Sequence, residues 1–154
     1  MQQYALKSLI CSLTLMAMAI LAPPSTAAEP EDVIKYRQAV MKSQGGHMGA
    51  AAQILKGKVD FGSDLEYHAS ALTASSAGLT KLFPKDSDFG ETRAKPEIWT
   101  NSAEFERASK DAEQAAKAFL AAVKSNDQAA VTRTFGDFAE ACKGCHKKFR
   151  EKKE

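Results

Sequence analysis

The pentapeptide Cys142-Lys143-Gly144-Cys145-His146 carries the strongest chemical signal in this sequence of 154 residues. Its pattern, C-x-x-C-H, is typical of covalent attachment of a c-type haem. On a helix, Cys142 and Cys145 share a face because they are three residues apart, so each thiol can meet one vinyl group of the same porphyrin. His146 follows Cys142 by four residues and can reach the iron from that side. The pattern predicts one haem c, linked through both cysteines, with His146 as an axial iron ligand.

Three other uses of the two cysteines fit the sequence less well. A thioredoxin-like redox pair needs a βαβ context and a helix N-terminus that lowers the thiol pKa, whereas this pair falls late in a helical segment. A structural zinc site needs four convergent ligands, and the adjacent Cys145 and His146 are poorly placed to bind one metal together with Cys142. A disulfide between Cys142 and Cys145 would distort the helix. Haem attachment is therefore the favoured interpretation.

In the rest of the chain after the N-terminal apolar run, apolar residues recur at helical spacing, and no segment shows the sustained apolar–polar alternation that is typical of strands. We predict an all-α fold, an antiparallel four-helix bundle enclosing one covalently bound haem. The expected helices cover residues 31–55, residues 65–83, a third segment capped by Asn101 or Ser102, and a fourth from about 126 to 149. The inner rows are rich in alanine, which leaves volume for a further group.

Two local features complicate this picture. The pair Gly45-Gly46 lies inside the first helix, where each glycine costs about 1 kcal/mol relative to alanine, so either the helix breaks there or a group approaches the backbone closely. The linker from Pro84 to Trp99 has no helical period and is unusually long for a compact bundle. We expect it to cover something.

The N-terminal segment has the composition of a secretory signal peptide. An apolar run from Leu9 to Ala22 follows the lone charge of Lys7, and small residues precede a cleavage site near Ala28. The run is shorter than the roughly 20 residues that span a bilayer. We predict a cleaved signal at residues 1–28 and one domain at residues 29–154. The mature protein is then periplasmic and free of the membrane, and Cys11 is removed with the signal.

Composition excludes several classes of protein. Collagen-like and disordered chains do not fit 44% hydrophobic and 26% charged residues, and three cysteines cannot staple a domain of this size. A net charge of +2 with no basic stripe argues against binding to nucleic acid. Away from the haem motif, the sequence offers no nucleophile paired with a base and no phosphate-binding loop, so we do not expect an enzyme.

With these features the sequence resembles the class II c-type cytochromes, the group that contains cytochrome c′. The resemblance rests on an exported four-helix chain with C-x-x-C-H near its C-terminus, followed by Lys147-Lys148-Phe149-Arg150. The segments 30–38 and 95–99 extend it over almost the whole mature chain. It implies that Arg37 and Gln38 bind a haem propionate, that Arg150 braces the haem edge near His146, and that Glu91 and Thr92 lie near that edge. It also implies that homodimers through the first two helices are common.

The resemblance leaves two roles open for Met41. In low-spin members a methionine at this position is the sixth iron ligand, and in high-spin members an apolar residue there packs over the iron without binding it. A plain core methionine is the third interpretation. We predict one-electron transfer with redox partner proteins as the function, because a thioether ligand favours it. The alternative is a five-coordinate iron that binds NO or CO, with Met41 packed over it.

Four further side chains have weaker signals. His47 is expected to be exposed, and His68 is expected to be a packed or surface imidazole, so neither is an expected iron ligand. Phe83 is expected to pack on the distal face of the haem, and Trp99 to fill an apolar gap at the start of the third helix.

Overall fold

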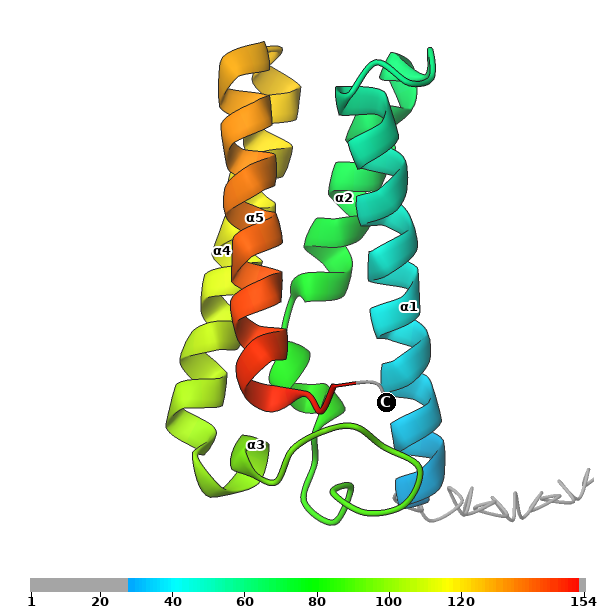
Figure 1. The fold of residues 1–154 in the computed structure, drawn as a ribbon, viewed down its shortest axis with the longest axis vertical. Coiled ribbons are helices and arrows are strands. Elements are labelled where there is room, and N and C mark those ends of the chain that lie inside the picture. The colour runs from blue at the N-terminus through cyan, green and yellow to red at the C-terminus, as the bar shows by residue number, and fades with distance from the viewer. Residues whose placement is uncertain (1–27, 153–154) are drawn as a thin grey trace, which may run out of the picture.

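The computed structural model describes residues 28–152, so residues 1–27 of the predicted signal peptide lie outside the described part. Figure 1 shows four main helices that run alternately up and down, which confirms the predicted antiparallel four-helix bundle. The bundle helices are α1 (Pro30–Leu55), α2 (Leu65–Ser76), α4 (Ser102–Ser125) and α5 (Gln128–Phe149). Short elements are α3 (Glu97–Thr100) and the 3₁₀ turns η1 (Gly62–Asp64) and η2 (Leu79–Leu82). Within residues 28–152, no helix is long and apolar enough to cross a membrane.

A tight turn sets α4 against α5. Asn126 ends α4 in the left-handed conformation, with φ of 54°, and Asp127 begins α5. The Asp127 carboxylate accepts a hydrogen bond of 3.0 Å from the Ala130 amide and so caps the first turn. Because the connection is so short, α5 must return along α4, which fixes the wall that carries the C-x-x-C-H motif.

The first helix is continuous, so the predicted alternative of a break at Gly45-Gly46 is wrong. α1 runs without interruption from Pro30 to Leu55, and Ile34 and Ala51 on its inner side are buried. Packing of this inner row outweighs the low helix propensity of the two glycines, both of which are exposed.

The second helix is shorter than predicted. α2 ends at Ser76, and Gly78 then adopts a left-handed φ of 65° before the 3₁₀ turn η2. Glycine takes this conformation without the steric cost that a Cβ imposes, so it is the usual residue at such a helix end. Leu79 and Leu82 continue the apolar spacing beyond this break, which is why the sequence predicted a helix that extends to residue 83.

The two ends of the bundle are packed differently. One end holds a continuous core in which Phe119 and Phe138 are fully buried among small residues. Five of the ten buried residues in that core are alanines: Ala51, Ala69, Ala112, Ala116 and Ala122. The other end holds only a small buried cluster of Ile98, Phe105 and Phe149. The sparse packing at this second end leaves room for the cavity described below.

The long linker closes this second end. It passes beneath the helices (Figure 1) and joins the last turn of α5 through backbone hydrogen bonds from Lys95 to Phe149 (3.0 Å) and from Glu151 to Arg93 (2.8 Å). The expectation that the linker covers something is therefore met. The sequence predicted no helical period in the linker. Its last residues nevertheless form a helical turn, because the one-turn helix α3 begins at Glu97.

Candidate functional site

A cavity of about 640 Å³ lies at the linker end of the bundle, with walls from α1, the linker, α4 and α5. Its volume is in the usual range for cofactor pockets. The structure brings all nine site residues named from the sequence to this one cavity: Arg37, Gln38, Met41, Glu91, Thr92, Cys142, Cys145, His146 and Arg150. Residues more than one hundred positions apart in the sequence therefore share one pocket.

The C-x-x-C-H motif occupies the last turns of α5. Cys142, Cys145 and His146 are each partly buried and line the cavity, and neither cysteine forms a disulfide within the described chain. Burial raises the pKa of the Cys142 thiol to about 11, with a smaller contribution from Cys145. Burial also raises the pKa of Cys145, although Arg150 opposes that rise. At neutral pH both are therefore protonated thiols, and as free cysteines that line the cavity both sulfurs are available for thioether bonds.

The surroundings of His146 favour the neutral form of its imidazole. Burial lowers the pKa of the His146 imidazole, and the positive charges of Arg150 and Arg93 lower it further. A neutral imidazole has a free nitrogen lone pair for a metal. Within residues 28–152, no three side chains of the His, Cys, Asp or Glu type converge on one point, which argues against the zinc alternative.

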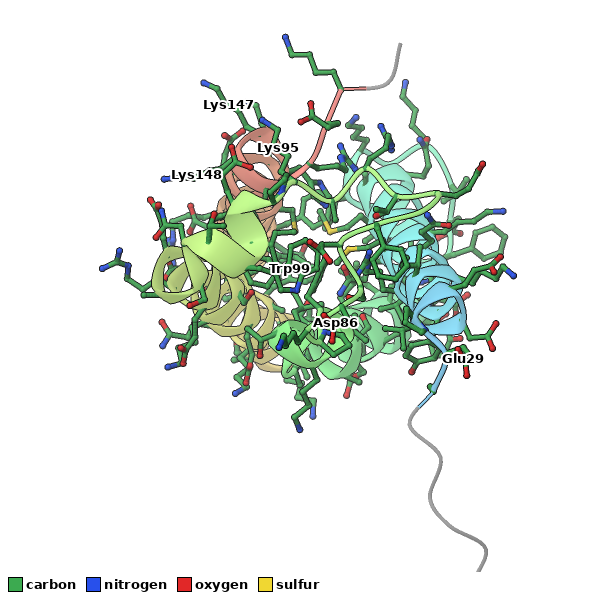
Figure 2. All side chains as sticks on the ribbon, turned by 90° about the horizontal axis from the view of Figure 1, so that it is seen from below. Glu29, Asp86, Lys95, Trp99, Lys147 and Lys148 are labelled. Carbon is green, nitrogen blue, oxygen red and sulfur yellow. The ribbon has the colours of Figure 1, made fainter. Side chains whose placement is uncertain are left out.

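A cluster of aromatic rings packs against Cys145 and lines part of the cavity. The Phe149 ring contacts Phe105 at a centroid distance of 5.2 Å, and Phe105 contacts Phe83 at 4.8 Å. Trp99 packs edge-on against Phe83 and lies near the middle of the end view in Figure 2. Its Nε1 donates a hydrogen bond of 2.9 Å to the Pro84 carbonyl. The predicted packing role of Trp99 thus includes anchoring the linker.

Arg37 is the most constrained polar residue of the site. Its side chain is only 3% exposed, and Phe83 stacks on the guanidinium at 4.8 Å. Both terminal nitrogens donate to the linker region: Nη1 to Ser87 Oγ (3.0 Å) and the Leu82 carbonyl (3.4 Å), Nη2 to the Ser87 carbonyl (2.8 Å) and Thr92 Oγ1 (3.0 Å). No carboxylate of the described residues lies within 4.0 Å of Arg37. The guanidinium therefore organises the linker, and none of its hydrogen bonds to described residues uses the Nε–H.

Gln38 and Glu91 contribute to the same connection. Gln38 Nε2 donates a hydrogen bond of 2.7 Å to the Glu91 backbone carbonyl. Two adjacent residues of α1 therefore bind the linker at separate points, which fixes the edge of the cavity where Glu91 and Thr92 lie.

Sequence reasoning missed two serines at this site. Ser87 is fully buried, and its hydroxyl also donates to the Pro84 carbonyl at 2.9 Å. Ser109, on α4, lines the cavity with 5% exposure, and its Oγ has no hydrogen-bond partner among the described residues. A buried hydroxyl without a partner is costly, so a polar group bound in the cavity fits this position. The one sequence signal for Ser109 is the helical period of α4, because this serine stands at an inner-face position where the period predicts an apolar residue.

The two remaining histidines lie away from the cavity. His47 is partly buried against His68, so the expectation that His47 is exposed is wrong. α1 and α2 pack side by side, and this contact covers the His47 ring. Neither residue lines the cavity.

The chain is similar to known haem proteins over nearly its full described length. The family model described as Cytochrome C′ matches residues 32–150. Cytochrome c′ of Pararhodospirillum photometricum is 33% identical over 125 residues, covering 80% of this chain and all of that protein. A nitric oxide complex of a substituted cytochrome c prime from Alcaligenes xylosoxidans superimposes with a TM-score of 0.76 at 29% identity, covering 82% and 99% of the two chains.

A second solved structure extends this likeness. It is a cytochrome c′ described as having an unusual ligand-controlled dimer dissociation, with a TM-score of 0.76 and 30% identity over 82% of this chain and 99% of that one. The family match, the shared fold and the conserved length agree with the cavity and its cysteine pair. The chain belongs to the cytochrome c′ family of class II cytochromes, whose members carry one covalently attached c-type haem.

Proposed function

We propose that this protein binds NO or CO at a haem iron whose sixth position is open. The observation that carries the proposal is that the apolar side chains of Leu79, Phe83 and Ile98 line the same cavity as His146 of α5. Cys142 and Cys145 would hold the haem on the α5 side through thioether bonds, and His146 would supply a nitrogen ligand to its iron. When bound, the haem supplies an iron that takes up a diatomic gas or exchanges one electron.

Part of the cavity that Met41 lines is apolar, which supports gas binding. Leu79, Phe83 and Ile98 line the same cavity and offer no hydrogen-bond donor from their side chains. An apolar wall of this kind offers no polar contact to water or to a charged ligand, whereas a small neutral gas needs none. Arg37 and Gln38 then act at the edge of the pocket, where the free Arg37 Nε–H can donate to a propionate while both residues hold the linker. The solved relative with bound nitric oxide has the same fold.

One-electron transfer is the second candidate, and the thioether of Met41 favours it. If this sulfur binds the iron, it raises the reduction potential and closes the site to gases. Lys95, Lys147 and Lys148 lie on one side of the linker end (Figure 2), where they would attract an acidic redox partner. Lys148 also pairs with Glu104, which orders part of this surface.

Substitutions of Met41 separate the two candidates. If Met41 only packs over the iron, Met41→Leu should leave the ferrous spectrum unchanged. Met41→Ala should then speed CO association by roughly tenfold, which corresponds to a barrier lowered by about 1.4 kcal/mol. Stopped-flow mixing of the reduced protein with CO measures both effects. Met48→Leu is the matched control, because Met48 is on the same helix but packs in the core at the other end.

A spectrum that changes from low-spin to high-spin in Met41→Leu, but not in Met48→Leu, would refute gas binding at an open iron and support the electron carrier. In either case the haem is attached through the same two cysteines, so the variants test the sixth position alone.

We further propose that the exported protein is periplasmic and forms a homodimer through α1 and α2. Tyr36 on α1 and Tyr67 on α2 are 63% and 66% exposed, so each of these helices presents an aromatic ring that a partner could cover. The similar structure with ligand-controlled dimer dissociation supports a link between gas and assembly. Sedimentation velocity of the reduced protein should show a dimer whose proportion falls when CO is added, and a monomer at all concentrations would contradict this proposal.

A further inference from the structure

The pair His47 and His68 joins α1 to α2 outside the haem cavity. Their Nδ1 atoms face each other at 2.9 Å, and the ring centroids are 5.2 Å apart. Both side chains are partly buried, and the exposed ring of Tyr67 packs against each of them. These are the two histidines outside the C-x-x-C-H motif, and no part of the haem site uses them.

The distance between the two nitrogens matches neighbouring ligands of one tetragonal metal ion. For metal–nitrogen bonds of about 2.0–2.1 Å, two ligands at a right angle are about 2.9 Å apart, whereas two ligands of a tetrahedral ion are about 3.3 Å apart. Nitrogen ligands in a square or tetragonal arrangement are typical of Cu(II). Copper also has the highest affinity of the divalent first-row metals for such ligands.

We propose that His47 and His68 form a binding site for a Cu(II) ion that bridges α1 and α2. In the hydrogen-bonded pair, one Nδ1 carries a proton and donates the hydrogen bond, and the other Nδ1 accepts that bond with its lone pair. When the metal binds, the Nδ1 proton of the donating ring moves to the Nε2 of the same ring, so both Nδ1 lone pairs are free for the metal. Each imidazole stays neutral and keeps one N–H proton. Small rotations about χ2 aim the two lone pairs at the shared ion.

Solvent completes the coordination. The pair supplies two protein ligands, and within the described residues no third His, Cys, Asp or Glu converges on them. We therefore expect an ion with two imidazole nitrogens and water or hydroxide in the remaining equatorial positions. Binding should also stabilise the bundle, because an ion held by both helices resists their separation.

The test is a calorimetric titration of the oxidised haem-loaded protein with Cu(II), combined with electron paramagnetic resonance. We expect one Cu(II) per chain with hyperfine coupling to two imidazole nitrogens. His47→Gln and His68→Gln should each weaken this binding by roughly tenfold or more, because each removes one arm of a chelate. Tyr67→Phe is the matched control, since it keeps both imidazoles and should bind as the wild type does.

The double variant His47→Gln/His68→Gln measures copper bound elsewhere, including at the amino terminus. Its thermal unfolding, oligomeric state and haem spectrum show that the fold and haem site are retained. Equal copper affinity in the wild type and the double variant would overturn the proposal. So would a spectrum without imidazole nitrogen coupling, or a Zn(II) affinity at least equal to that of Cu(II).

Discussion

Replacing Cys142 and Cys145 together by alanine is expected to abolish covalent haem attachment. Both thiols line the cavity from the same helix, and the third cysteine of the sequence, Cys11, is in the predicted signal peptide. The double variant should therefore lose all haem on a denaturing gel stained for haem peroxidase activity. Each single variant should keep one thioether, and its pyridine haemochrome band should shift because one vinyl group stays unsaturated.

Lys143→Ala is the matched control for this experiment. Lys143 lies between the two cysteines but is exposed, and its ion pair among the described residues is with Glu140, three residues earlier on the helix surface. It should retain covalent haem in full. Covalent haem on the double variant would show that attachment uses another side chain, and the proposed site would be wrong.

Arg37→Ala is expected to cause a large loss of stability although Arg37 lies outside the haem motif. The change removes the donors that satisfy Ser87 and Thr92, and it leaves the buried Ser87 carbonyl without its partner from α1. Hydrogen bonds from a charged group and the cost of unpaired buried acceptors together suggest a loss of about 3 kcal/mol in the free energy of unfolding. Urea unfolding of the haem-loaded protein, followed by circular dichroism, measures it.

Two further variants make the Arg37 result specific. Arg37→Lys should recover only part of the stability, because an ammonium cannot reproduce the planar fork that reaches Ser87 and Thr92 at once. Lys35→Ala, two residues away on the same helix, removes an exposed charge paired with Glu31 and should change the midpoint little. If Arg37→Ala unfolds at the same midpoint as Lys35→Ala, the guanidinium does not hold the linker as described.

The features that the sequence predicted well depend on the spacing of residues that are close together in the chain. Apolar spacing located the bundle helices, and the motif of Cys142, Cys145 and His146 lies on the last of them and lines the cavity, as its helical spacing indicated. The end of α2 was missed for a local reason as well. Gly78 is a signal for a helix end, but Leu79 and Leu82 continue the apolar row beyond it, so apolar spacing alone predicts a longer helix.

The features that could not be predicted depend on how distant segments meet. The donors of Arg37 reach residues 82–92, and no periodicity shows which part of a linker a buried guanidinium will contact. The contact between His47 and His68 depends on the rotation of α1 relative to α2. A rotation of one helix by a single residue would separate the rings. The resemblance to the family named Arg37 and Gln38 as site residues, but only the structure shows their bonds to the linker.

The absorption spectrum of the reduced wild-type protein, recorded with and without CO, tests the central claim most directly. A c-type haem with an open sixth position should give a five-coordinate high-spin ferrous spectrum that changes fully on adding CO. A six-coordinate low-spin ferrous spectrum that CO leaves unchanged would contradict gas binding, and would instead identify Met41 as a ligand of an electron carrier.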